Sequence, residues 1–118
     1  MEVIFYVKED GTEPAWEFIK KLNKDMRAKI YRLIDMLEVL GPSMRRPYSA
    51  PVGDGIFELR AQFGTDISRI LYFFVVNGRA VLTNGFVKKT EKTPSAEIER
   101  AKQYRSDYLK RSVSNGNV

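Results

Sequence analysis

The chain has 118 residues and a mass of 13.6 kDa, the size of a single domain with a hydrophobic core of its own. It contains neither cysteine nor histidine, which excludes disulfide frameworks, thiolate nucleophiles, Cys/His zinc sites and imidazole bases. Any chemistry must therefore use Lys, Arg, Tyr, Ser, Thr or carboxylate side chains. The net charge is +5, and residues 79–118 account for all of it with nine basic and four acidic residues. A localised basic segment predicts an anionic partner, either nucleic acid or an acidic protein segment; a solvated helix face of mixed charge is the alternative.

The sequence carries no sign of a membrane segment. No basic stretch precedes the apolar residues at the N-terminus, and the longest apolar run, Ile70–Val76, is far shorter than the roughly 20 residues that span a bilayer. We therefore expect a cytoplasmic protein without membrane contact. We further expect one domain over residues 1–111 and a flexible tail over residues 112–118.

The first part of the chain predicts one strand and two helices. Residues 2–8 are rich in β-branched and aromatic types and end in a turn, which predicts a strand. Thr12 is expected to cap a helix with Pro14 in its first turn, and Asn23 a second helix that ends at Gly41. Apolar residues recur at helical spacing in both, so we expect the two helices to pack on a sheet.

Three strands and a final helix are predicted in the rest of the chain. Residues 42–55 contain three prolines and are expected to form a surface loop. The apolar patterns that follow predict strands over residues 56–63, 67–76 and 79–87. Asn77-Gly78 predicts a type I′ hairpin turn, and Gly85 predicts either a bulge or a close backbone approach.

Thr93-Pro94 predicts the start of the final helix. The contact side of this helix is expected to consist of Ile98, Ala101, Tyr104 or Arg105, and Tyr108. The order strand, helix, helix, three strands, helix indicates an α+β domain around a small, mostly antiparallel sheet, with the two N-terminal helices and the C-terminal helix packed on it.

Basic side chains are predicted to gather at one end of this sheet. Arg60 falls on the polar side of its strand, whereas Arg69 lies in an otherwise apolar run, where a guanidinium needs a partner. That partner is either Glu58 or Asp66 in an ion pair, or the phosphate of a ligand. Three ammonium groups lie just before the final helix, a position that favours bound phosphate oxygens: Lys88, Lys89 and Lys92.

Such a cluster suits cleavage of RNA without a metal or other cofactor. A ribose 2′-hydroxyl attacks the adjacent phosphorus, guanidinium groups stabilise the charge of the phosphorane, and a lysine whose pKa is lowered by burial and like charges accepts the proton. The expected catalytic groups are Arg60, Arg69, Lys88 and Lys89. The expected RNA contacts are Arg45, Arg46, Lys92 and Phe86. The aromatic residues considered for base stacking are Phe86 and Tyr48.

Four segments together resemble the RelE/HigB toxin superfamily, in its phage-derived HigB-like branch: Phe57–Arg60, Arg69–Phe73, Gly85–Pro94 and Glu97–Ala101. The resemblance covers about residues 2–110 and is most specific in the Lys-Lys-Thr-Glu-Lys-Thr-Pro block at residues 88–94.

The resemblance implies a toxin of a type II toxin–antitoxin system that cleaves mRNA, usually on the ribosome, and whose partner is a helix-turn-helix antitoxin protein. Arg60 and Arg69 match the strand arginines of the superfamily, and the three lysines match its basic stretch after the last strand. The branch often has a histidine where this chain has Asn84, and an asparagine is not a base at neutral pH.

Two other functions fit the sequence. One is a metal-dependent nuclease, in which Asp54 and Glu58 hold Mg²⁺ and Arg60 contacts the phosphate. Activity in the presence of a chelator would eliminate it. The other is a binding module without catalysis, in which the basic end grips RNA or an acidic protein segment.

Overall fold

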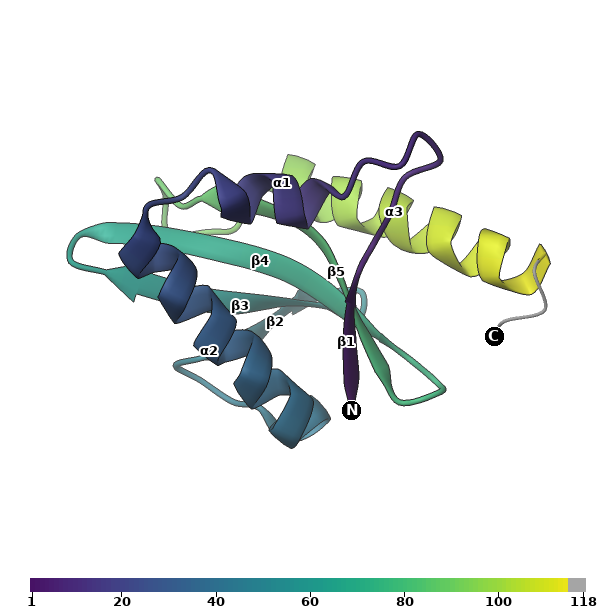
Figure 1. Ribbon diagram of the computed structural model, residues 1–118, viewed down its shortest axis with the longest axis horizontal. Coiled ribbons are helices and arrows are strands. Elements are labelled where there is room, and N and C mark those ends of the chain that lie inside the picture. Colours follow the sequence, from purple (N-terminus) through teal and green to yellow (C-terminus); the bar gives the residue numbers. More distant parts are fainter. Residues whose placement is uncertain (115–118) are drawn as a thin grey trace.

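The computed structural model describes residues 1–114 of the chain as a five-stranded sheet with helices on both faces (Figure 1). In chain order the elements are β1 (Glu2–Phe5), α1 (Pro14–Lys20), α2 (Lys24–Leu40), a short 3-10 helix η1 (Gly41–Ser43), β2 (Ser49–Gly53), β3 (Ile56–Phe63), β4 (Asp66–Val75), β5 (Arg79–Val87) and α3 (Ser95–Ser114). The strands lie in the order β1-β5-β4-β3-β2, with β1 parallel to β5 and every other pair antiparallel. The predicted α+β class and mostly antiparallel sheet are confirmed.

The two faces of the sheet carry separate hydrophobic clusters, because side chains alternate along each strand. On one face, α1 and α2 cover a cluster that includes Leu59, Ile70 and Leu82. On the other face, α3 packs through Ala101 on a smaller cluster. As expected, Tyr108 also joins this contact. Of the two alternatives, Tyr104 and Arg105, it is Tyr104 that packs here, while the Arg105 guanidinium donates to the Asp54 carbonyl. In Figure 1 the far end of α3 extends beyond the strands.

The predicted loop over residues 42–55 contains a strand, which corrects that expectation. Residues Ser49–Gly53 form β2 at the edge of the sheet and pair with β3. Pro51 is tolerated there because one side of an edge strand has no hydrogen-bonding partner to lose. The two strands form a local hairpin around Asp54-Gly55, a dipeptide typical of hairpin turns, but the prolines and turn-forming residues of the segment indicated a loop.

The helix caps are partly as predicted. The Asn23 side chain caps α2 by accepting a hydrogen bond from the Met26 N–H at 2.9 Å. The expected cap at Thr12 is wrong, because α1 begins one residue later with Glu13 at its N-cap. Thr12 instead belongs to the preceding turn, where its N–H donates to Asp10 Oδ1 at 2.8 Å.

The hairpin between β4 and β5 turns at the expected residues but with a different geometry. Val75 pairs with Arg79, so the loop has three residues, and Gly78 has a φ of 76° while Asn77 lacks the positive φ of a type I′ turn. The bulge in β5 falls at Thr83, which has no partner between the pairs Leu71–Asn84 and Tyr72–Leu82.

Gly85 is a site of close backbone approach, as one of the two alternatives predicted. A Cβ atom at this position would lie 2.8 Å from Ile70 Cδ1 and closer still to the ring of Phe18 in α1. A side chain at this position would therefore push α1 off the sheet.

The predicted start of the tail at residue 112 is too early, since α3 continues to Ser114. The last four residues of the predicted tail lie outside the described part of the chain. Within residues 1–114, none of the helices combines the length and apolar character needed to cross a membrane.

Candidate functional site

The register of the sheet brings Arg60 and Arg69 side by side on the face that carries α3. The two are Cα partners in the β3–β4 pair, and Arg69 is in turn the Cα partner of Phe86 in β5. Directly opposed residues of an antiparallel pair have Cβ atoms about 5 Å apart, and like charges in such positions repel. The arrangement therefore requires negative charge nearby.

Glu58 supplies part of that charge from the same face of β3. Its side chain is buried, with 1% of its surface exposed. Oε2 accepts a hydrogen bond from Arg60 Nε at 2.8 Å and lies 3.5 Å from Arg69 Nε, whereas Oε1 accepts from Thr93 Oγ1 at 2.5 Å. Of the two predicted ion-pair partners of Arg69, the structure therefore selects Glu58 over Asp66, but this carboxylate is shared with two other groups.

Arg69 keeps unused hydrogen-bonding capacity. Its side chain is buried, and Nη1 donates to the Ser68 carbonyl at 3.3 Å. Within the described residues, Nε has no hydrogen-bond partner, because its distance to Glu58 exceeds good bonding geometry. Burial lowers the pKa of Arg69 from its usual value, and the positive charge of Arg60 adds to this shift while Glu58 opposes it.

Lys88 adds a third positive charge beside the two arginines. Its N–H donates to the Ile67 carbonyl at 2.9 Å, which continues the pairing of β5 by one residue beyond Val87. Alternation then places its side chain on the same face as Phe86 and Arg69. Burial lowers the pKa of Lys88, and the charges of Arg69 and Arg60 lower it further, against Glu58 and Glu91.

We call Arg60, Arg69 and Lys88 the cationic cluster. Its three positive charges face one buried carboxylate, Glu58, so the cluster as a whole attracts an anion. The loop that leads into α3 is fixed against it by the Thr93–Glu58 hydrogen bond. A cavity of about 340 Å³ lies along this contact, and its wall includes Arg60, Lys92, Thr93 and the carboxylates of Glu58 and Glu91.

The predicted lysines are only partly brought together. Lys88 is half-buried within the cluster, and Lys92 is exposed and lines the cavity beside Arg60. Lys89 is also exposed but lines neither this cavity nor the groove described next. The structure thus gives a defined place to two of the three ammonium groups.

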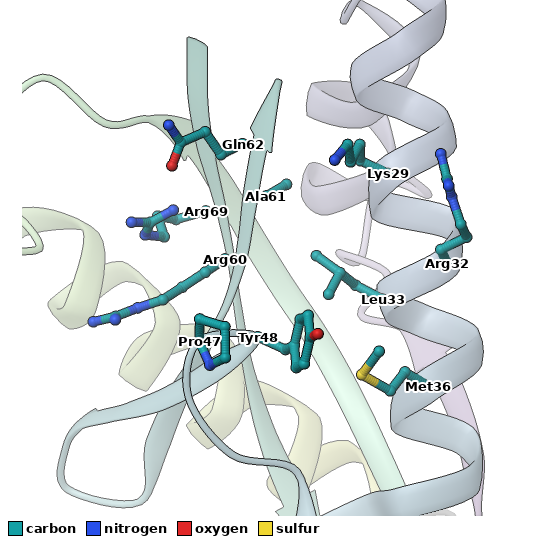
Figure 2. A pocket seen from close by; sticks show the side chains of 10 residues that line it. All are labelled: Lys29, Arg32, Leu33, Met36, Pro47, Tyr48, Arg60, Ala61, Gln62 and Arg69. Atoms are coloured by element: carbon teal, nitrogen blue, oxygen red, sulfur yellow. The ribbon is translucent and has the colours of Figure 1, made fainter. Parts of the chain in front are cut away.

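A larger groove of about 470 Å³ begins at Arg60 and Arg69 and passes around the edge of β3 to α2 (Figure 2). Its walls also include Tyr48, before β2, and basic and apolar side chains of α2. Figure 2 shows the two arginines pointing away from α2, while the Tyr48 side chain lies between the strand and the helix. The groove therefore connects the cationic cluster with the opposite face of the sheet.

The predicted RNA contact at Phe86 needs correction. Phe86 is 8% exposed and packs in the cluster under α3, because alternation from Arg69 across to β5 places it under the helix. Its ring borders neither the cavity nor the groove, so it is not placed to stack on a base there. Tyr48, with 47% of its surface exposed, is the aromatic residue that borders the groove.

Arg45 and Arg46 are exposed but line neither the cavity nor the groove. The guanidinium of Arg45 donates to the carbonyls of Pro42 at 2.8 Å and Met44 at 3.2 Å, which stabilises the end of η1. Two basic residues of the groove, Lys29 and Arg32, were not predicted from the sequence, because α2 was interpreted only through its apolar stripe. Their spacing of three residues, beside Leu33 in that stripe, was the available signal.

The carboxylates of the alternative metal site have other partners. Asp54 lies in the β2–β3 turn with a φ of 53°, and its Oδ2 accepts a hydrogen bond from Lys102 Nζ at 3.0 Å. Glu58 is bonded to Arg60 and Thr93 instead. Across residues 1–114, no three side chains of the types His, Cys, Asp and Glu are grouped so as to hold a metal ion.

Asn84 connects β5 to the final helix, α3. It lies at the position where the HigB-like branch that the sequence resembles often has histidine. It is buried, and its Nδ2 donates to the Glu97 carbonyl at 3.2 Å and to Glu97 Oε1 at 3.0 Å. These bonds hold the first turn of α3 against β5. Asn84 thus fixes the helix beside the cationic cluster and provides no basic group.

Comparison with known proteins identifies one family. Residues 17–106 match the family described as "Phage derived protein Gp49-like (DUF891)". The matched segment runs from α1 into α3 and contains the cationic cluster and the groove. A search of curated proteins found no match to this chain.

Proposed function

Because the chain belongs to the Gp49-like family of phage-derived proteins, which is associated with the toxins of toxin–antitoxin systems, we propose that it is a type II toxin of RelE/HigB type that cleaves mRNA. Its substrate is mRNA on the ribosome, and hence in the cytoplasm, and its partner is a helix-turn-helix antitoxin protein that neutralises it. The observation that carries this proposal is the charge of the cationic cluster, where Arg69 is buried with its Nε unpartnered among the described residues.

A phosphodiester group fits this cluster better than a simple protein carboxylate. Guanidinium groups bind two oxygens of a carboxylate or of a phosphate, but only on the phosphate does the charge of those oxygens grow, as the phosphorane forms. Arg60 and Arg69 lie next to each other on one face, so both reach the same phosphate. Their stabilisation is therefore stronger in the transition state than in the ground state, which is what accelerates a reaction.

The reaction needs no metal in this scheme. The ribose 2′-oxygen forms a bond to phosphorus, its proton passes to Lys88, and the bond from phosphorus to the 5′-oxygen breaks. The leaving 5′-oxygen takes a proton from solvent, so the products are a 2′,3′-cyclic phosphate and a 5′-hydroxyl. The lowered pKa of Lys88 increases the fraction of neutral amine available to accept the proton.

Induced expression in bacteria that lack an antitoxin tests this function. We expect the native chain to arrest growth and Arg69→Met to relieve the arrest, because removing one donor to a transition-state oxyanion costs about 100- to 1000-fold in rate. Arg100→Met is the matched control, since Arg100 is an exposed arginine paired with Glu97 on α3. Growth arrest by all three chains would refute a catalytic role of the cluster, and no arrest by the native chain would refute the toxin.

A further inference from the structure

We propose that the groove between α2 and the edge of β3 binds a nucleotide of single-stranded RNA next to the cleaved linkage, with its base stacked on Tyr48. This inference rests on the proposed function, because it places the same RNA strand that is cleaved at the cationic cluster. It adds Tyr48, Lys29 and Arg32 as residues that bind and position the substrate.

The groove exists because two neighbouring strands differ in length. β2 pairs with β3 only as far as Ser49 and Leu59, and the Arg60 N–H makes one further bond to the Tyr48 carbonyl at 2.9 Å. β3 then continues to Phe63 without β2 beside it. The space that β2 leaves open lies between this free edge and α2, and Tyr48 stands at its entrance (Figure 2).

The charge of the groove favours a polyanion. Four of its ten lining residues are basic, and none of those ten is acidic: Lys29, Arg32, Arg60 and Arg69 carry the positive charge. Two of the four, Arg60 and Arg69, belong to the cationic cluster, so the groove begins where the phosphate is bound. In Figure 2 the Lys29 side chain is directed from α2 toward the strands.

The remaining lining residues favour a nucleobase over a peptide side chain. Tyr48 offers an exposed ring, and Leu33, Met36 and Ala61 form an apolar surface behind it. A basic groove with an aromatic platform is the arrangement that binds single strands, in which each stacked base contributes about 1–3 kcal/mol. A base in a duplex is already stacked on its neighbours and is not free to lie on Tyr48, so the groove selects single-stranded RNA.

Fluorescence anisotropy with a labelled 2′-O-methyl pentanucleotide tests the groove separately from cleavage, because this strand has no free 2′-hydroxyl. We expect Tyr48→Ala to weaken binding about tenfold or more. Tyr48→Phe should bind like the native chain, because stacking requires the ring and not the hydroxyl.

The contribution of α2 is measured by the salt dependence of the same binding. Replacing both Lys29 and Arg32 by Ala should reduce the slope of log Kd against log salt by about 1.4, since each phosphate contact to a single strand contributes about 0.7. Lys24→Ala is the matched control, because Lys24 lies on the same helix outside the groove. Its slope should equal that of the native chain.

Three results would overturn this inference: unchanged affinity in Tyr48→Ala, an unchanged slope in the double variant, or displacement of the strand by a polyglutamate peptide that binds more tightly, which indicates an acidic protein as the occupant. The proposed function fails in a different way. If the native chain binds the pentanucleotide through Tyr48 but does not cleave RNA, the groove is supported and the nuclease is refuted. If the native chain cleaves RNA and the Tyr48→Ala variant binds the pentanucleotide as tightly as the native chain, the nuclease is supported and the groove is refuted.

Discussion

Replacing Glu58 should destabilise the fold far more than replacing Arg69, although the two form one ion pair. In Glu58→Gln the two opposed guanidiniums lose the negative charge that offsets their repulsion. The hydrogen bond from Arg60 also loses its charged acceptor. A charge-assisted hydrogen bond contributes about 1.5–3 kcal/mol, and breaking a buried ion pair costs about 3–5 kcal/mol. The Arg60 side chain is 27% exposed and remains partly hydrated, so we expect a loss of about 2–4 kcal/mol in the free energy of unfolding.

Arg69→Met should change the stability little, for a reason that lies in the same geometry. Glu58 keeps its bonds to Arg60 and Thr93, so no buried charge is orphaned, and a guanidinium whose Nε lacks a partner among the described residues is removed. We expect a stability within about 1 kcal/mol of the native chain, or above it. The double variant, Glu58→Gln with Arg69→Met, should recover part of the loss, because the repulsion between the arginines is gone.

Urea denaturation followed by circular dichroism measures these differences. Glu17→Gln serves as the control, because Glu17 forms an exposed ion pair with Lys20 within α1 and should change the unfolding free energy by less than about 0.5 kcal/mol. A stability of Glu58→Gln equal to that of this control, or equal losses in Arg69→Met and Glu58→Gln, would contradict this role of the Glu58 carboxylate.

Three further predictions concern other parts of the molecule. Gly85→Ala should lower the free energy of unfolding by about 1–3 kcal/mol in urea denaturation, because the added Cβ collides with the ring of Phe18. Adding Phe18→Leu to this variant should restore part of the loss, whereas equal stability of Gly85→Ala and the native chain would contradict the close approach. If Lys88 accepts the proton, the cleavage rate should rise with pH through a pKa below the usual 10.5 of lysine, and this rise should vanish in Lys88→Met. The same dependence of the rate on pH in both chains would exclude Lys88 as the base. Tyr6→Phe removes a bond of 2.5 Å to Asp107 Oδ2 and should cost about 1 kcal/mol. Burial and this bond raise the pKa of Tyr6 from 10.0 to about 12, so the stabilisation is complete below pH 10 and is lost as the pH rises to 12; the difference between the two chains in urea midpoint should shrink over this range and not below it.

Local patterns in the sequence were sufficient to predict most of the secondary structure. The apolar stripe of α2 and the strands β3, β4 and β5 lie where periodicity placed them, because each is long enough to show its period. The edge strand β2 was missed, since its residues resemble a loop and only the pairing with β3 makes them a strand. The cap of α1 was misplaced for a similar reason, because Thr12 is equally able to serve a turn.

The candidate site was predicted in composition but not in arrangement. Alternation placed Arg60 on the polar side of its strand, and Arg69 stood out as a charge in an apolar run. Their direct opposition follows from the turn after Phe63, which sets the register of β3 and β4. The burial of Phe86 depends on α3 packing over β5, a tertiary contact without a local signal. The groove likewise depends on where β2 begins, so Tyr48 was noted in the sequence without a position in space.

The chemistry of the RNA ends tests the central claim most directly. Purified protein is incubated with ribosomes carrying mRNA in a buffer with enough Mg²⁺ to keep the ribosomes intact, and in parallel with free single-stranded RNA in EDTA, and the product ends are identified by mass spectrometry. We expect 2′,3′-cyclic phosphate and 5′-hydroxyl ends from the native chain, cleavage about 100- to 1000-fold slower by Arg69→Met, and none when the nucleotide at the cleaved linkage is 2′-deoxy. Cleavage at the native rate by Arg69→Met, or products with 5′-phosphate ends from a 2′-deoxy linkage, would contradict attack by the 2′-hydroxyl at the cationic cluster.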